Sequence, residues 1–204
     1  VINDCIMIDN AMNNFKACLP IDTKSQVKKW IKVAIQKANQ MGITGVHDAW
    51  QDATTISAIQ ELIKEDQFSI RCYGMLASND QSLLKTFFNR GHYITDYLTI
   101  RSVKAFIDGA LGSRGAALHQ PYDDDLNNCG LILITTDRFN QLAQDCYKYN
   151  FQLNTHAIGD RGNSYVLDHY TKILHPNNTK RWRIEHAQMV ADDDLYRFKD
   201  FNII

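Results

Sequence analysis

The chain has 204 residues, of which 45% are hydrophobic and 22% are charged, and its formal net charge is −1. This composition belongs to a globular protein that can bury a core, and it contains no basic stripe or charge block of the kind that indicates a nucleic-acid partner. The longest apolar runs are far shorter than a membrane span.

Helical and strand patterns alternate along the chain. Apolar spacing predicts a helix over residues 23–40, then Gly42, then a short strand over 43–46 that ends in His47-Asp48. Further strands are expected at 68–76, 98–107, 151–156 and 182–186, and further helices at 55–64, 80–89, 137–149, 163–173 and 192–199. Residues 109–130 form a long loop, and residues 201–204 resemble the start of another strand.

This alternation predicts a parallel α/β architecture. A (β/α)8 barrel or a doubly wound sheet would fit, but no Gly-x-Gly-x-x-Gly follows the first strand, which disfavours the second. A complete barrel needs about 250 residues. We therefore expect residues 1–204 to be an internal piece of one TIM-type barrel, from about strand 2 to the start of strand 7, with the flanking parts absent.

The five cysteines are scattered and include no Cys-x-x-Cys pair. Such a set is typical of free thiols in a reducing compartment, so we expect a cytoplasmic protein.

Two histidines, His156 and His186, end successive predicted strands. Neighbouring parallel strands would bring both imidazoles to the same edge of the sheet, where α/β proteins place ligands and metals. Either histidine alone is more simply interpreted as a hydrogen-bonded structural residue. Because they occupy equivalent places in two successive units, together they favour a metal site. His47, which also ends a predicted strand, is more simply structural.

Three further residues are candidates for the site. Lys104 lies within a predicted strand among apolar neighbours; it is either a solvent-facing lysine or a buried lysine with a task. Asp108 and Arg114 belong to the glycine-containing stretch that follows this strand. Arg114 could bind a carboxylate, or it could be a surface residue of a turn.

Three segments resemble amidohydrolase family 3, the group of the N-substituted formamide deformylases. They are residues 103–117, with Lys104 and Asp108-Gly-Ala-Leu-Gly-Ser-Arg114; residues 154–161, with His156-Ala-Ile-Gly-Asp-Arg161; and residues 183–188, Arg-Ile-Glu-His-Ala-Gln. Residues 8–12 and 42–49 also resemble the family, so the resemblance covers nearly the whole chain. The resemblance is specific enough to indicate the family, but it gives much weaker information about the substrate.

The resemblance implies a metal-dependent hydrolase that cleaves carbon–nitrogen bonds other than peptide bonds, with zinc as the expected divalent ion and a small-molecule amide or formamide as substrate. By position, His156, His186 and Lys104 would be metal ligands, with Lys104 matching a lysine that relatives can carboxylate. Arg114 and Asp108 would bind substrate. The family's His-x-His pair does not occur in this sequence, and its catalytic aspartate is expected beyond residue 204.

Without those residues, we expect the chain alone to be inactive, and it could form a homodimer to cover exposed strand edges. The alternatives are a non-catalytic barrel fragment with structural histidines and an α/β binding module without metal.

Overall fold

The computed structural model describes residues 2–3, 6–7, 12, 15 and 18–204. The chain forms two compact units: unit 1 comprises Val1–Leu19 and Ala105–Ile204, and unit 2 comprises Pro20–Lys104. In unit 1, β1 (Ile2–Asn3) and β2 (Ile6–Met7) form a short antiparallel pair. The family-like segment 8–12 lies outside the described residues except for Met12.

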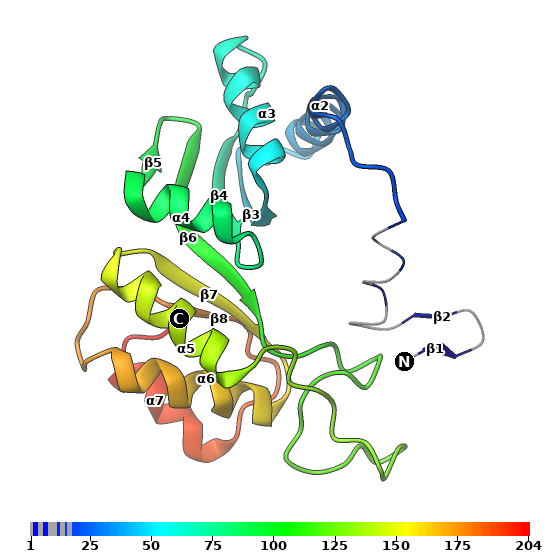
Figure 1. The fold of residues 1–204 in the computed structure, drawn as a ribbon, viewed down its shortest axis with the longest axis vertical. Coiled ribbons are helices and arrows are strands. Elements are labelled where there is room, and N and C mark those ends of the chain that lie inside the picture. Colours follow the sequence, from blue (N-terminus) through cyan, green and yellow to red (C-terminus); the bar gives the residue numbers. More distant parts are fainter. Residues whose placement is uncertain (1, 4–5, 8–11, 13–14, 16–17) are drawn as a thin grey trace. The chain divides into compact units, whose positions relative to one another are not determined.

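Unit 2 is built on parallel strands with helices between them (Figure 1). Its strands are β3 (Gly45–Gln51), β4 (Arg71–Ala77) and β6 (Leu98–Phe106), whose last two residues belong to unit 1. Its helices are α2 (Lys24–Gln40), α3 (Ala53–Lys64) and α4 (Gln81–Arg90). Asp52 and Asp80 cap α3 and α4 by accepting backbone N–H groups in the first turn.

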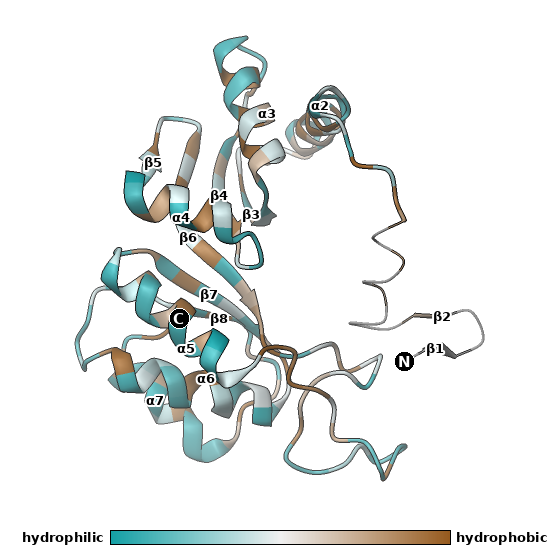
Figure 2. Ribbon diagram, in the orientation of Figure 1, coloured by the Kyte–Doolittle hydropathy of each residue, from teal (hydrophilic) through white to brown (hydrophobic). Residues whose placement is uncertain are grey.

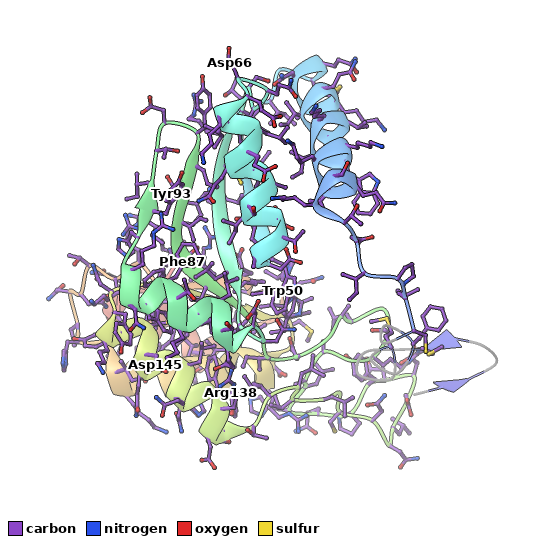
Figure 3. The ribbon with its side chains drawn as sticks, turned by 45° about the horizontal axis from the view of Figure 1, so that its top comes forward. Trp50, Asp66, Phe87, Tyr93, Arg138 and Asp145 are labelled. Carbon is purple, nitrogen blue, oxygen red and sulfur yellow. The ribbon has the colours of Figure 1, made fainter. Side chains whose placement is uncertain are left out.

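The register of unit 2 confirms the expected parallel ladder, because His47 pairs with Tyr73 and Val46 with Cys72. β4 pairs with β6 in the same sense. A short strand that the sequence pattern did not predict, β5 (Tyr93–Ile94), runs antiparallel to β6. Figure 3 shows Phe87 of α4 and Tyr93 of β5, and the Arg90 guanidinium lies 5.8 Å and 5.0 Å from the centroids of their rings.

Unit 1 contains the parallel strands β7 (Gln152–Ala157) and β8 (Arg183–His186). Its helices are α5 (Thr136–Lys148), α6 (Asp160–Ile173) and α7 (Leu195–Asp200), the last preceded by the 3-10 turn η2 (Asp192–Asp194). The Thr155 hydroxyl lies 2.7 Å from the Tyr170 hydroxyl of α6, so this side of β7 faces the helix. Figure 2 shows both hydrophilic and hydrophobic residues along β7, although all six are buried, and Trp182 and Phe139 of the same unit are completely buried.

The end of the chain pairs with β8 as a parallel neighbour. The N–H of Ile204 donates to the carbonyl of Trp182 over 3.0 Å, and the N–H of Ile184 donates to the carbonyl of Ile204 over 2.8 Å. The predicted strand over 201–204 was too long, because residues 201–202 form a turn and only Ile204 pairs.

Two predicted boundaries were wrong in an informative way. β3 runs to Gln51, so His47 and Asp48 lie inside the strand rather than at its end. Pairing with β4 extends β3 beyond its apolar residues, which the sequence pattern alone does not reveal. α6 begins at Asp160 rather than at residue 163. Within the described part of the chain, no helix is both long enough and apolar enough to cross a membrane.

Candidate metal centre

The structure brings His156 and His186 together at the same end of β7 and β8. Their ring centroids are 4.7 Å apart and the ring planes meet at 73°. Both strands run in the same direction, with Ala157 opposite His186 in the ladder. The sequence therefore located this pair correctly, although a metal-binding role for it stays a prediction.

The backbone at His186 explains how the two rings meet. His156 lies opposite Glu185 in the ladder, so a regular strand would place the next side chain, His186, on the other face of the sheet. Instead, His186 has a φ of 79° and Ala187 a φ of 41°, which ends the strand and changes the direction of the His186 side chain. Such a conformation costs about 1–3 kcal/mol and is concentrated at functional sites.

His156 itself is buried and held by a small group of neighbours. Its ring packs 5.1 Å, centroid to centroid, from the ring of Phe106. Its Nε2 atom lies 3.4 Å from the carbonyl oxygen of Gly109 and 3.4 Å from Oδ1 of Asp108. The residues that follow β6 therefore form one wall around this histidine.

Asp108 is a buried connector between three segments. Its Oδ1 accepts the N–H of Ile158 over 2.9 Å, and its Oδ2 accepts the N–H groups of Gly159 over 2.8 Å and Ala117 over 3.0 Å. Gly159 is the N-cap residue of α6 and has no side chain to cap the helix, so a carboxylate from a distant segment lies at this helix start. This contact accounts for the early start of α6. The predicted substrate-binding role of Asp108 stays a prediction.

Arg114 lies in the loop after β6 and adopts a φ of 55°. Its guanidinium donates to both carboxylate oxygens of Asp124, over 3.0 Å and 2.5 Å. This hydrogen bonding lowers the pKa of the Asp124 carboxyl below its ordinary value. Arg114 is thus a partly exposed residue that pairs with an acidic residue of its own loop, and its predicted contact with substrate stays a prediction.

Lys104 is almost completely buried in β6, and its carbonyl oxygen accepts the N–H of Ser78 over 3.1 Å. It belongs to unit 2, whereas both histidines belong to unit 1. Its predicted convergence with the histidines, and its role as a third ligand, stay predictions.

Asn163 is a residue that the sequence analysis missed. Its side-chain amide is completely buried and donates over 2.9 Å to the carbonyl of Gly159 and over 2.9 Å to the carbonyl of Met189. It therefore joins the loop after β7 to the loop after β8, the two loops that follow the histidines. A polar residue on the buried face of an amphipathic helix was the available signal.

Asp160 and Arg161, at the start of α6, bind neighbouring loops. Gly159, not Asp160, is the N-cap of α6, and the Asp160 carboxylate accepts the backbone N–H groups of Arg161 and His119. The Arg161 guanidinium donates to the carbonyls of Cys129 and Gly130. Glu185 pairs with Arg183 over 2.7 Å.

The two adjacent imidazoles fit a divalent metal as two of its ligands, because neutral imidazole nitrogen is a common ligand for zinc and related ions. A catalytic zinc site uses three protein ligands. The described residues contain no cluster of three or more His, Cys, Asp or Glu side chains that could hold an ion.

The amidohydrolase family model matches residues 6–204, nearly the entire chain. The chain belongs to the amidohydrolase family. A relative in Arabidopsis thaliana, Protein LONG AFTER FAR-RED 3, is 36% identical over 124 residues, which are 60% of this chain and 21% of that protein. YtcJ of Bacillus subtilis (strain 168) is 25% identical over 195 residues, which are 93% of this chain and 36% of that protein.

This amidohydrolase-family chain is also similar to a solved structure, an uncharacterized metal-dependent hydrolase from Pyrococcus furiosus. The TM-score is 0.81 at 25% identity, and the match covers 96% of this chain and 41% of that protein. The fold is therefore α/β, a partial (β/α)8 barrel of the TIM type. The chain spans 21% to 41% of the length of these three relatives.

Proposed function

We propose that the complete protein is a metal-dependent hydrolase of carbon–nitrogen bonds other than peptide bonds, acting on a small amide or formamide with zinc as its ion. One observation carries the proposal: in a chain of the amidohydrolase family, two imidazoles lie 4.7 Å apart at the end of parallel strands. This is the end of an α/β sheet at which active sites are built.

The chemistry follows from what each residue can do. When bound, a divalent ion lowers the pKa of its water and polarises the scissile carbonyl. His156 and His186 would hold the ion through neutral ring nitrogens, and Lys104 is the proposed third ligand from this chain. Phe106 packs against His156 and keeps water from one side of its ring. The proton of the reaction is proposed to move through an aspartate carboxylate.

Arg114 is proposed to contact the substrate from the loop after β6. It would have to exchange its pairing with Asp124 for the substrate, and the pair is exposed enough for this to cost little. Asp108, at the base of the same loop, is also proposed to take part in substrate binding. We also propose a cytoplasmic location, supported by the four described cysteines, which form no disulfide, and a homodimer as a way to cover strand edges.

The test is metal analysis of the complete protein together with turnover on a panel of formamides and amides. His156→Ala and His186→Ala should each remove the metal and nearly all turnover. His175→Ala is a matched control, because this histidine is exposed in the loop after α6. A double variant of His156 and His186 that kept both metal and rate would show that these histidines are structural.

A further inference from the structure

We propose that Asp108 is a positioning residue which, together with the carbonyl of Gly109, holds neutral His156 in the tautomer with hydrogen on Nε2. The Nδ1 lone pair would then be the atom presented to a metal. The metal part of this inference rests on the proposed function. The tautomer part concerns the protein without metal and stands on its own.

Two oxygen atoms lie near the Nε2 atom of His156. Its two polar neighbours are the Gly109 carbonyl oxygen and Oδ1 of Asp108, each at 3.4 Å. An ionised carboxylate and a carbonyl can only accept hydrogen bonds. In a neutral ring, hydrogen on Nε2 can be donated to the Gly109 carbonyl and lies beside the Asp108 carboxylate, whereas a lone pair there would face two oxygen atoms. Nδ1 has no hydrogen-bond partner among the residues that the structure describes, so it is available to a ligand.

The carboxylate of Asp108 cannot change its position to suit the tautomer of His156. Its carboxylate is completely buried and already accepts the N–H groups of Ala117, Ile158 and Gly159. The space beside it is also filled, because a Cβ added at Gly162 would lie 2.5 Å from Oδ2. The carboxylate is therefore a fixed acceptor, and the imidazole is the partner that must choose its tautomer.

The contact of His156 with Asp108 and Gly109 should affect the affinity of His156 for a metal ion. Metal-bound histidines usually donate their second ring N–H to a carboxylate or carbonyl, and removing such a partner typically costs about 10- to 100-fold in metal affinity. Asp108 and Gly109 supply both kinds of acceptor to the same nitrogen of His156. The ring of Phe106 packs against another side of the His156 imidazole and restricts its movement there. The arrangement thus fixes both the orientation and the ligating atom of His156 before any ion binds.

The experiment is 15N spectroscopy of the histidine side chains in the complete, metal-free protein at a pH where the rings are neutral. The His156 resonances are assigned by their loss in His156→Ala. We expect hydrogen on Nε2 and a lone pair on Nδ1. The opposite tautomer, or an even mixture of the two, would overturn the proposal.

Two variants test the role of Asp108. Asp108→Asn should shift His156 toward a mixture of tautomers and weaken zinc affinity about 10- to 100-fold. Gly162→Ala keeps the carboxylate but displaces it, so it should cause a smaller shift in the same direction; it also serves if Asp108→Asn does not fold. The matched control is Asp124→Asn, which removes an exposed carboxylate of the same loop and should leave the tautomer unchanged. An unchanged His156 spectrum in the folded Asp108 or Gly162 variant would refute the positioning role.

These results separate the inference from the proposed function. Hydrogen on Nε2 in a protein that binds no metal would support the tautomer assignment while the hydrolase proposal failed. Strong zinc binding in a protein whose His156 carries hydrogen on Nδ1 would support the hydrolase proposal and overturn the role of Asp108.

Discussion

At the scale of single residues, Asp108 shows how a buried carboxylate can replace a local helix cap. Its oxygens accept three backbone N–H groups from two other segments. Asp108→Ala would leave these donors buried without a partner, at about 1–3 kcal/mol each. We expect a loss of about 3 kcal/mol or more in the free energy of unfolding, measured by urea denaturation. Asp124→Ala, which removes an exposed carboxylate, should change the stability much less.

Arg114, unlike Asp108, should affect substrate binding and contribute little to stability. Its pairing with Asp124 is exposed, so Arg114→Ala should leave the stability nearly unchanged. If Arg114 binds the substrate equally in the ground state and the transition state, the variant should raise KM and leave kcat near the wild-type value. Steady-state kinetics on the best formamide substrate would measure this. A fall in kcat with an unchanged KM would contradict the assignment.

The cysteines provide a prediction that needs no substrate. Burial raises the pKa of the Cys72 thiol to about 12, and the fraction of reactive thiolate at pH 8 is correspondingly small. Burial also raises the pKa of Cys146. In the folded protein a thiol reagent at pH 8 should modify the exposed Cys18 and leave these two unmodified until denaturant is added. Modification of Cys72 at the rate of Cys18 would contradict the buried position of β4.

At the scale of elements, the start of α6 depends on close packing against the loop after β6. A Cβ at Gly159 would lie 2.0 Å from the carbonyl oxygen of Ala117, so the backbone would have to move. Gly159→Ala should therefore destabilise the protein by about 1–3 kcal/mol. Gly45→Ala is the matched control, because its added Cβ would meet its nearest neighbour at 3.6 Å, an ordinary contact. Equal melting temperatures for the two variants would be inconsistent with this packing.

The same elements show what the sequence could predict. α2 was placed within one residue because its apolar spacing and the Thr23 cap are local signals. The start of α6 was placed too late because its cap, Asp108, is 51 residues from Gly159 in the chain. β5 was missed because only pairing with β6 makes two residues a strand. Local patterns therefore predicted the elements, and contacts between distant segments decided their ends.

In the candidate site, too, local patterns predicted positions, whereas contacts between distant segments decided the details. The positions of His156 and His186 at the ends of successive strands could be predicted from their spacing. The positive φ of His186, which changes the direction of its side chain, could not, because a positive φ is uncommon for residues other than glycine and no local pattern indicates it here. The buried contacts of Asp108 and Asn163 also depend on how loops approach each other. The sequence therefore predicted which residues are near one another better than it predicted their contacts.

At the scale of the whole molecule, metal binding should appear as stability. A ligand that binds only the folded state stabilises it by RT ln(1 + [L]/Kd), or about 2.7 kcal/mol at 100 times Kd. If His156 and His186 hold the ion in the complete protein, chelation should lower the melting temperature by several degrees, and zinc should restore it. The measurement is a thermal melt of the protein as isolated, after treatment with a chelator, and after zinc is returned.

The histidine variants decide whether this shift comes from the proposed centre. His156→Ala and His186→Ala should melt at the same temperature with and without chelator, because each lacks a ligand and the ion no longer binds tightly. His175→Ala should keep the full difference, since its side chain is exposed and it lies in the loop after α6 rather than at either strand end. A chelator effect that persisted in both His156 and His186 variants would place the metal elsewhere in the protein. A wild-type protein without any such effect would favour structural histidines.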